Sequence, residues 1–203
     1  TSLLNIRDDS NPLYITLGNP HLKNERGHNF SAIYHCKFHK MFFNVSASGH
    51  ITENAVASGF IYNKETGVRT VMPENVNGNW SMGPHIGLNI ALDKDDKWRL
   101  KQDVSYTHNN SVDLSGTSES MVASKSVVKS DNINENISLT WRPSSKYEFG
   151  TNGNLAYQHS GSDREGFTPM NVYTFQYGAR AQLELPLNFK VSTDITMYSR
   201  RDD

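Results

Sequence analysis

The fold is decided by residues 171–199, which read NVYTFQYGARAQLELPLNFKVSTDITMYS. Apolar and polar side chains alternate along this stretch, break at Leu185-Pro186-Leu187, and then alternate again. A period of two residues is typical of a strand, because successive side chains point to opposite faces of a sheet. Two such runs with a tight connection predict an antiparallel hairpin. Each run has about 12 residues, roughly twice the ~5–6 of an ordinary strand.

The same alternation recurs through the rest of the chain. It predicts strands over residues 28–38, 41–47 with a continuation toward 62, 80–92, 98–107, 133–141 and 147–158. We therefore expect an all-β fold, an antiparallel up-and-down meander of about eight long strands, over residues 28–200. Residues 1–27 are expected to be an irregular lead-in with one short strand at 13–17. Glu135 stands among the alternate residues of its strand that are otherwise apolar. We expect it at a strand end beside a long loop over 108–131.

The connections between these strands alternate strictly between short and long. The stretches 63–79, 108–131 and 160–170 are predicted to be the long ones. In a transmembrane barrel one rim carries tight turns and the other carries extended loops. Aromatic residues gather near strand ends, as expected of girdles at the two membrane interfaces, although aromatic residues favour strands in general. They are Tyr34, Phe38, Trp98, Trp141, Tyr147, Tyr157 and Tyr173. The pattern favours part of a transmembrane β-barrel with a polar lumen.

The amino-acid composition argues against several classes of protein. The 203 residues carry 20 Lys plus Arg against 21 Asp plus Glu, which argues against a nucleic-acid-binding protein. Cys36 is the one cysteine, so no internal disulfide can form, and we interpret it as a small apolar residue. No stretch approaches the ~18 apolar residues of a transmembrane helix, but a barrel strand needs only ~9–11 residues. The two ends of the chain resemble cuts within a longer protein.

Two segments resemble TonB-dependent-receptor-like outer-membrane barrels. Residues 11–25, NPLYITLGNPHLKNE, precede His28-Asn29-Phe30 and are similar to a GNP-x-LKPE phrase that comes before a barrel strand in that family. Asn24 stands where proline is usual. The second segment runs from Thr66 to Thr70 and from Pro73 to Trp80, and it is similar to a loop that leads into a strand.

The resemblance implies a large barrel with an N-terminal plug, placed in the bacterial outer membrane. It implies a receptor or transporter for a nutrient ligand that the sequence does not name, energised by a periplasmic coupling protein. Such barrels have roughly 22 strands, so about eight strands form only part of the ring. The whole of residues 1–203 is then a barrel segment, and its partners are the rest of the barrel and plug, the coupling protein and outer-membrane lipid. No plug or coupling motif is recognisable in this sequence.

The sequence offers no catalytic, metal or cofactor site. His35 and His39 are four residues apart but precede a predicted turn and lack a third ligand. Asp93, Asp95 and Asp96 lack the glycine and closing glutamate of a calcium loop, so a solvated turn is expected. No nucleophile elbow or phosphate-binding glycine loop is present. We expect no enzyme activity and no cofactor.

Charges on the polar parity are the candidates for lining a substrate path. They are Arg99, Lys101, Asp103, Arg180, Glu184, Lys190 and Asp194. The simpler interpretation is that mixed charges hydrate the interior and pair across strands. A different class remains open, a soluble all-β carbohydrate-binding module that stacks sugars on Trp80 and Trp98. The two classes differ in whether the apolar parity points outward to lipid or inward between two sheets.

Overall fold

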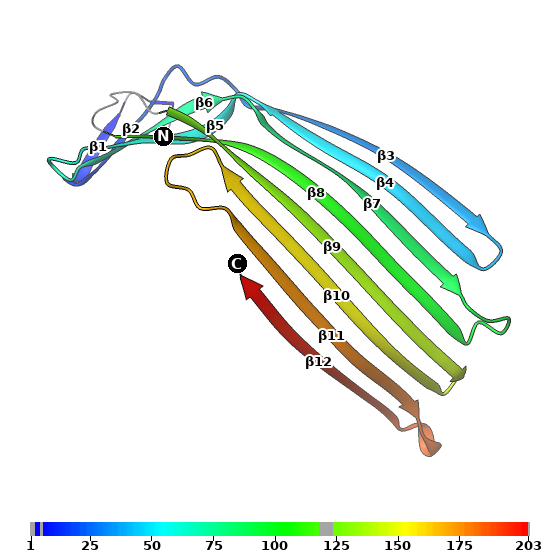
Figure 1. Cartoon of the computed structure of the whole chain (residues 1–203). Coiled ribbons are helices and arrows are strands. Elements are labelled where there is room, and N and C mark those ends of the chain that lie inside the picture. Colours follow the sequence, from blue (N-terminus) through cyan, green and yellow to red (C-terminus); the bar gives the residue numbers. More distant parts are fainter. Residues whose placement is uncertain (1–2, 5, 118–123, 203) are drawn as a thin grey trace.

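A computed structural model describes residues 3–4, 6–117 and 124–202. Twelve strands in these ranges form a single sheet. Eight of them make an antiparallel meander in which each strand pairs with the next, as predicted. They are β3 (Arg26–Phe38), β4 (Met41–Glu53), β7 (Asn79–Ala91), β8 (Trp98–Thr117), β9 (Ser124–Ser144), β10 (Tyr147–Ser162), β11 (Met170–Glu184) and β12 (Lys190–Asp202). Figure 1 shows them as a long, curved and twisted sheet.

Short connections join the strands at one end of the meander, as the alternation of connection lengths predicted. They fall at residues 39–40, 92–97, 145–146 and 185–189, the last containing the 3₁₀ turn η1 (Pro186–Asn188). His39, Asp96 and Leu187 adopt positive φ angles of 51°, 57° and 64° in these turns. The Lys40 ammonium lies 3.0 Å from the Asp96 carboxylate and ties two of the turns together.

The opposite end carries a small additional sheet that the sequence did not predict. The backbone kinks at Asn54 and continues as β5 (Ala55–Tyr62), which pairs with β6 (Arg69–Val76). The prediction of an unstructured long connection over 63–79 was therefore wrong, because strand β6 lies within it. The lead-in holds β2 (Tyr14–Leu17), near the expected short strand, and also β1 (Arg7–Asn11), which was missed. We call β1, β2, β5 and β6 the cap.

The few buried apolar residues of the described chain lie in the cap and in the part of β8 that packs against it. Ala55 and Val76 pack with Leu114 of β8, and both Val76 and Leu114 are only 1% exposed. The packing of Leu114 against the cap also explains why the loop prediction for residues 108–131 was wrong. The predicted loop over 108–131 is mostly strand, because β8 and β9 stay in register from Trp98↔Trp141 to Ser115↔Ser124. The tip of that hairpin, residues 118–123, lies outside the described residues.

The sheet is open. Within the described ranges β3 pairs only with β4 and β12 pairs only with β11, so each outer strand has one unpaired edge. Figure 1 shows β3 and β12 at opposite margins of the curved sheet. No helix in the described residues is long and apolar enough to cross a membrane.

Candidate lumen-lining surface

Strand register sorts the side chains of the meander onto two faces. On one face, Val104 lies beside Ile86 and Glu135, and the row continues through Leu155 to Phe175. We call this the apolar face. The residues between them in sequence, such as Asp103 beside Gly87 and Asn136, form the polar face. Since the pairing is continuous across eight strands, side chains of the same alternation lie on the same face from β3 to β12.

Two aromatic rows bound the apolar face. Near the short turns, the Trp141 ring stacks on Trp98 and Phe149 with centroids 5.4 and 5.5 Å apart. Near the cap, the rings of Tyr157 and Tyr173 lie 4.8 Å apart. Trp98 and the cap-side Tyr106 are eight residues apart on β8, about 26 Å along a strand. A strand tilted by ~40° turns this into about 20 Å of height, close to the ~25 Å apolar band of a membrane barrel.

All seven charged residues predicted to line the lumen lie on the polar face. The structure brings some of them together. The Lys101 ammonium lies 3.2 Å from the Asp103 carboxylate, whose other oxygen is 3.5 Å from Nε2 of His85. Other expected pairs face each other in register without a direct ion pair between them: Arg180 opposite Asp194, and Glu184 opposite Lys190. Arg99 lies opposite Thr140.

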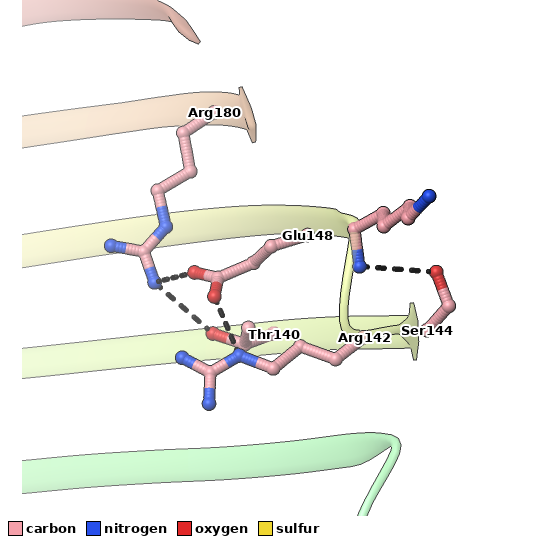
Figure 2. A network of polar contacts seen from close by, with 6 residues as sticks. Thr140, Arg142, Ser144, Glu148 and Arg180 are labelled. Carbon is pink, nitrogen blue, oxygen red and sulfur yellow. Dashed lines mark hydrogen bonds and ion pairs between the residues drawn. The ribbon is translucent and has the colours of Figure 1, made fainter. Parts of the chain in front are cut away.

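A carboxylate bridged by two guanidinium groups is the main charged cluster of this face (Figure 2). Glu148 of β10 accepts a hydrogen bond from Arg142 Nε of β9 at 2.5 Å and one from Arg180 Nη2 of β11 at 2.9 Å. Nη2 of Arg180 also contacts Thr140 Oγ1 at 3.4 Å. We call Arg142, Glu148 and Arg180 the Arg–Glu–Arg cluster. Its formal charge is one positive unit, close to the short-turn rim.

Burial within the cluster is uneven. The Glu148 side chain is 16% exposed, whereas Arg142 and Arg180 are 60% and 45% exposed. Gly150 permits the arrangement, because a Cβ there would lie 2.9 Å from Arg180 Nε, which crosses over it toward Glu148. The arginines therefore retain exposed donor groups on the polar face while sharing one carboxylate.

Sequence reasoning missed Arg142 and Glu148. Arg142 lies just beyond the predicted strand 133–141 and directly before Pro143, and Glu148 lies at the start of the predicted strand 147–158, whose polar side begins at Gly150 in the prediction. Extending the alternation by one step, from Gly150 to Glu148, would have placed Glu148 on the polar face. Which arginine it bonds is set by the cross-strand register, and the sequence does not state it.

Neutral polar groups also line the polar face between its charged residues. Asn154 Nδ2 donates to Oδ1 of Asn134 at 2.6 Å and to Oδ1 of Asn136 at 2.8 Å, joining β9 and β10. Nδ2 of Asn44 lies 3.4 Å from Nδ1 of His85 across β4 and β7. Amides and hydroxyls that bond one another above the backbone ladder suit a wet lumen better than a packed core.

The described residues show no grouping suited to metal chemistry. No three His, Cys, Asp or Glu side chains among them lie close enough to hold a metal ion. His35 stacks on Phe42, with ring centroids 5.8 Å apart. Asp93 accepts the Trp98 N–H at 2.8 Å, and this hydrogen bond lowers the pKa of its carboxyl in the turn. The free thiol of Cys36 is half-buried.

Comparison with known proteins bears on the apolar face. A family model described as the outer membrane protein beta-barrel family matches residues 1–128, which is more than half of the chain. The match covers the cap and the meander through β8 into β9. No curated protein and no solved structure matches the chain.

Proposed function

Because the chain belongs to the outer membrane protein beta-barrel family, we propose that it forms part of a TonB-dependent-type receptor or transporter for a nutrient. The chain lies in the bacterial outer membrane, with its apolar face toward lipid. The polar face then lines the lumen through which the ligand passes. The observation that carries the proposal is this polar face, with its charged Arg–Glu–Arg cluster, opposite a lipid-facing band of membrane height.

The unpaired edges point to the first partner. In lipid, each backbone N–H and C=O needs an internal partner, so an open sheet edge is costly. The outer edges of β3 and β12 therefore pair with further strands that complete the ring. The resemblance of residues 11–25, 66–70 and 73–80 to TonB-dependent-receptor-like barrels supports a plug inside that ring and a periplasmic energy-coupling protein.

We propose that the protein performs no covalent chemistry and uses no cofactor. Its role is to bind the nutrient at the loops and pass it along the polar face. The soluble carbohydrate-binding module is not favoured. A sandwich would bury the apolar face under a second sheet, whereas Ile137 and Phe175 in its middle are 44% and 44% exposed. Trp98, one of the two rings considered for sugar stacking, instead stacks on Trp141.

Uptake by living cells tests the proposal. Cells with and without the full-length protein are grown in spent medium, and depletion of each nutrient is followed by mass spectrometry. We expect at least one nutrient to be depleted only when the protein is present, and the depletion to stop when an uncoupler collapses the proton gradient. Depletion that continues unchanged after uncoupling contradicts an energised transporter.

A matched pair of variants links uptake to the lumen. Glu148→Gln removes the charge that the two arginines share on the polar face. Glu135→Gln makes the same change on the apolar face of the adjacent strand. We expect Glu148→Gln to change the rate or concentration dependence of uptake and Glu135→Gln to leave both near wild type. Equal effects, at equal protein levels in the membrane, contradict the assignment of the polar face to the path.

A further inference from the structure

The apolar face carries a polar hollow just beyond its cap-side aromatic row. Next after Tyr106, Tyr157 and Tyr173 on this face comes the row His108, Asp131, His159 and Asn171, and then the row Asn110, Lys129 and Gly161. The hollow is lined by Lys129, Asp131, His159, Gly161 and Asp163. Aromatic belts lie at the level of the lipid headgroups, so this hollow faces the headgroup layer on the loop side of the membrane.

A missing side chain creates the hollow. Gly161 lies in register with Lys129, and a Cβ at Gly161 would meet only Nε2 of His159, at 3.6 Å. His159 Nδ1 is 2.9 Å from Oδ1 of Asn171, which turns Nε2 of the same ring toward Gly161. The hollow therefore has an imidazole nitrogen on one wall and the Lys129 chain on another.

The charged groups of the hollow are of both signs. Oδ1 of Asp131 accepts the Tyr106 hydroxyl at 2.6 Å and is 2.7 Å from Nδ1 of His108. Oδ1 of Asp163 accepts the Val127 N–H at 2.6 Å. Each carboxylate is thus held through one oxygen, and its Oδ2 has no hydrogen bond within the described ranges.

Lys129 supplies the positive charge. Its side chain is exposed and its ammonium makes no ion pair or hydrogen bond with any described residue. A simple anion would meet Lys129 and Nε2 of His159 but also two carboxylates, which repel it. A headgroup with both a phosphate and a primary amine is attracted by both signs of charge in the hollow. Its phosphate would pair with Lys129, and its ammonium would pair with Asp131 and Asp163.

We infer that this hollow is a binding site for a membrane lipid whose headgroup carries a phosphate and a primary amine, as phosphoethanolamine does. The acyl chains of that lipid run down the apolar face over Tyr106, Tyr157 and Ile133. The lipid source, rather than a soluble phosphoamine, follows from the position of the hollow directly above the lipid-facing band. The inference depends on the membrane position of the sheet and not on the nutrient that the lumen passes.

Lipid binding to the full-length protein tests the inference. Native mass spectrometry in detergent measures the affinity for phosphatidylethanolamine, phosphatidylglycerol and phosphatidylcholine, and for free phosphoethanolamine. We expect phosphatidylethanolamine to bind most tightly, because phosphatidylglycerol lacks the amine and phosphatidylcholine has no N–H to donate. Equal binding of the three lipids overturns the inference, and so does free phosphoethanolamine that competes as well as the lipid.

Variants locate the site. Lys129→Gln removes the ammonium, and Asp163→Asn removes a charge but keeps an Oδ1 acceptor for the Val127 N–H. Each variant should bind phosphatidylethanolamine roughly tenfold or more weakly than wild type, as expected for loss of a charge-assisted hydrogen bond. The control is Lys125→Gln, a lysine of the same strand on the same face but outside the hollow, which should bind like wild type. If all three variants bind phosphatidylethanolamine with equal affinity, the site is contradicted. Heat-modifiable gel mobility confirms that each variant is folded.

Discussion

The side-chain amide of Gln102 donates a hydrogen bond of 2.7 Å to Glu135 on the apolar face of the sheet. Both residues lie between the tryptophan row and the tyrosine row, so the pair faces the lipid band. Glu135 was expected at a strand end above this zone, and that expectation was wrong because β9 extends from Ser124 to Ser144. A polar group in lipid is costly unless it has a partner. Gln102 is the partner that makes this glutamate tolerable.

A double-mutant cycle measures this coupling. Leucine is placed at Gln102, at Glu135 and at both positions, and unfolding free energies of the full-length protein are measured in bilayers. We expect a coupling energy of about 1 kcal/mol, because each single change leaves one polar group unpaired in lipid. We also expect the double variant to be at least as stable as wild type, since apolar side chains replace the pair. Additive single changes would contradict the contact.

The tryptophan row makes a prediction about stability. Trp141 stacks on both Trp98 and Phe149, whereas Trp98 has only the ring of Trp141 among the described residues. Trp141→Ala should lower the unfolding free energy by about 3 kcal/mol, and Trp98→Ala by less. Denaturant unfolding in bilayers, followed by gel mobility, gives both values. A larger loss for Trp98→Ala would show that the row is not built around Trp141.

The kink that separates β4 from β5 makes a further prediction. Asn54 has a φ of 52°, its N–H donates to Oδ1 of Asn77 and its carbonyl accepts from Nδ2 of Asn75, both at 2.7 Å. Asn54→Gly keeps this backbone and should be tolerated. Asn54→Val should cost about 1–2 kcal/mol, because a β-branched residue is strained at positive φ. Limited proteolysis of the cap compares the two variants, and equal resistance would contradict the role of Asn54.

Acid dependence is expected from the turn over 92–97. The Trp98 N–H holds the pKa of Asp93 below its ordinary value, so the charged carboxylate is favoured in the folded state. Its contribution to stability is complete above the unfolded pKa of ~3.9 and is lost as pH falls through the lower folded pKa. Asp93→Asn keeps an acceptor without the charge. We expect the stability difference between wild type and Asp93→Asn to shrink below about pH 4, measured by unfolding at several pH values.

The sequence predicted the meander well where apolar and polar residues alternate strictly. All eight long strands, including the hairpin of residues 171–199, were found, because burial on one face requires a period of two. The extension of β8 past Thr107 was missed, since Asn109 and Asn110 have low strand propensity. The ladder to β9 and the burial of Leu114 outweigh that propensity.

The polar face was predicted less completely than the fold. The alternation of polar and apolar residues placed Arg180 and Lys101 on the correct face, since the face of a residue depends only on its neighbours in sequence. The partner of Arg180 depends on register, which brings it to Glu148, 32 residues away, rather than to Asp194 opposite it on β12. Side-chain reach and the space over Gly150 decide that choice, and neither is visible in a pattern of alternation.

The central claim is that the apolar face contacts lipid and the polar face contacts water in the lumen. Ile137 and Ser138 are neighbours on β9 that point to opposite faces. Each is replaced by cysteine in a Cys36→Ser background of the full-length protein, spin-labelled, and placed in bilayers. We predict that oxygen from the lipid relaxes the label at 137 and that a water-soluble nickel chelate relaxes the label at 138. Equal access of the chelate to both labels, or the reverse order, would contradict the claim.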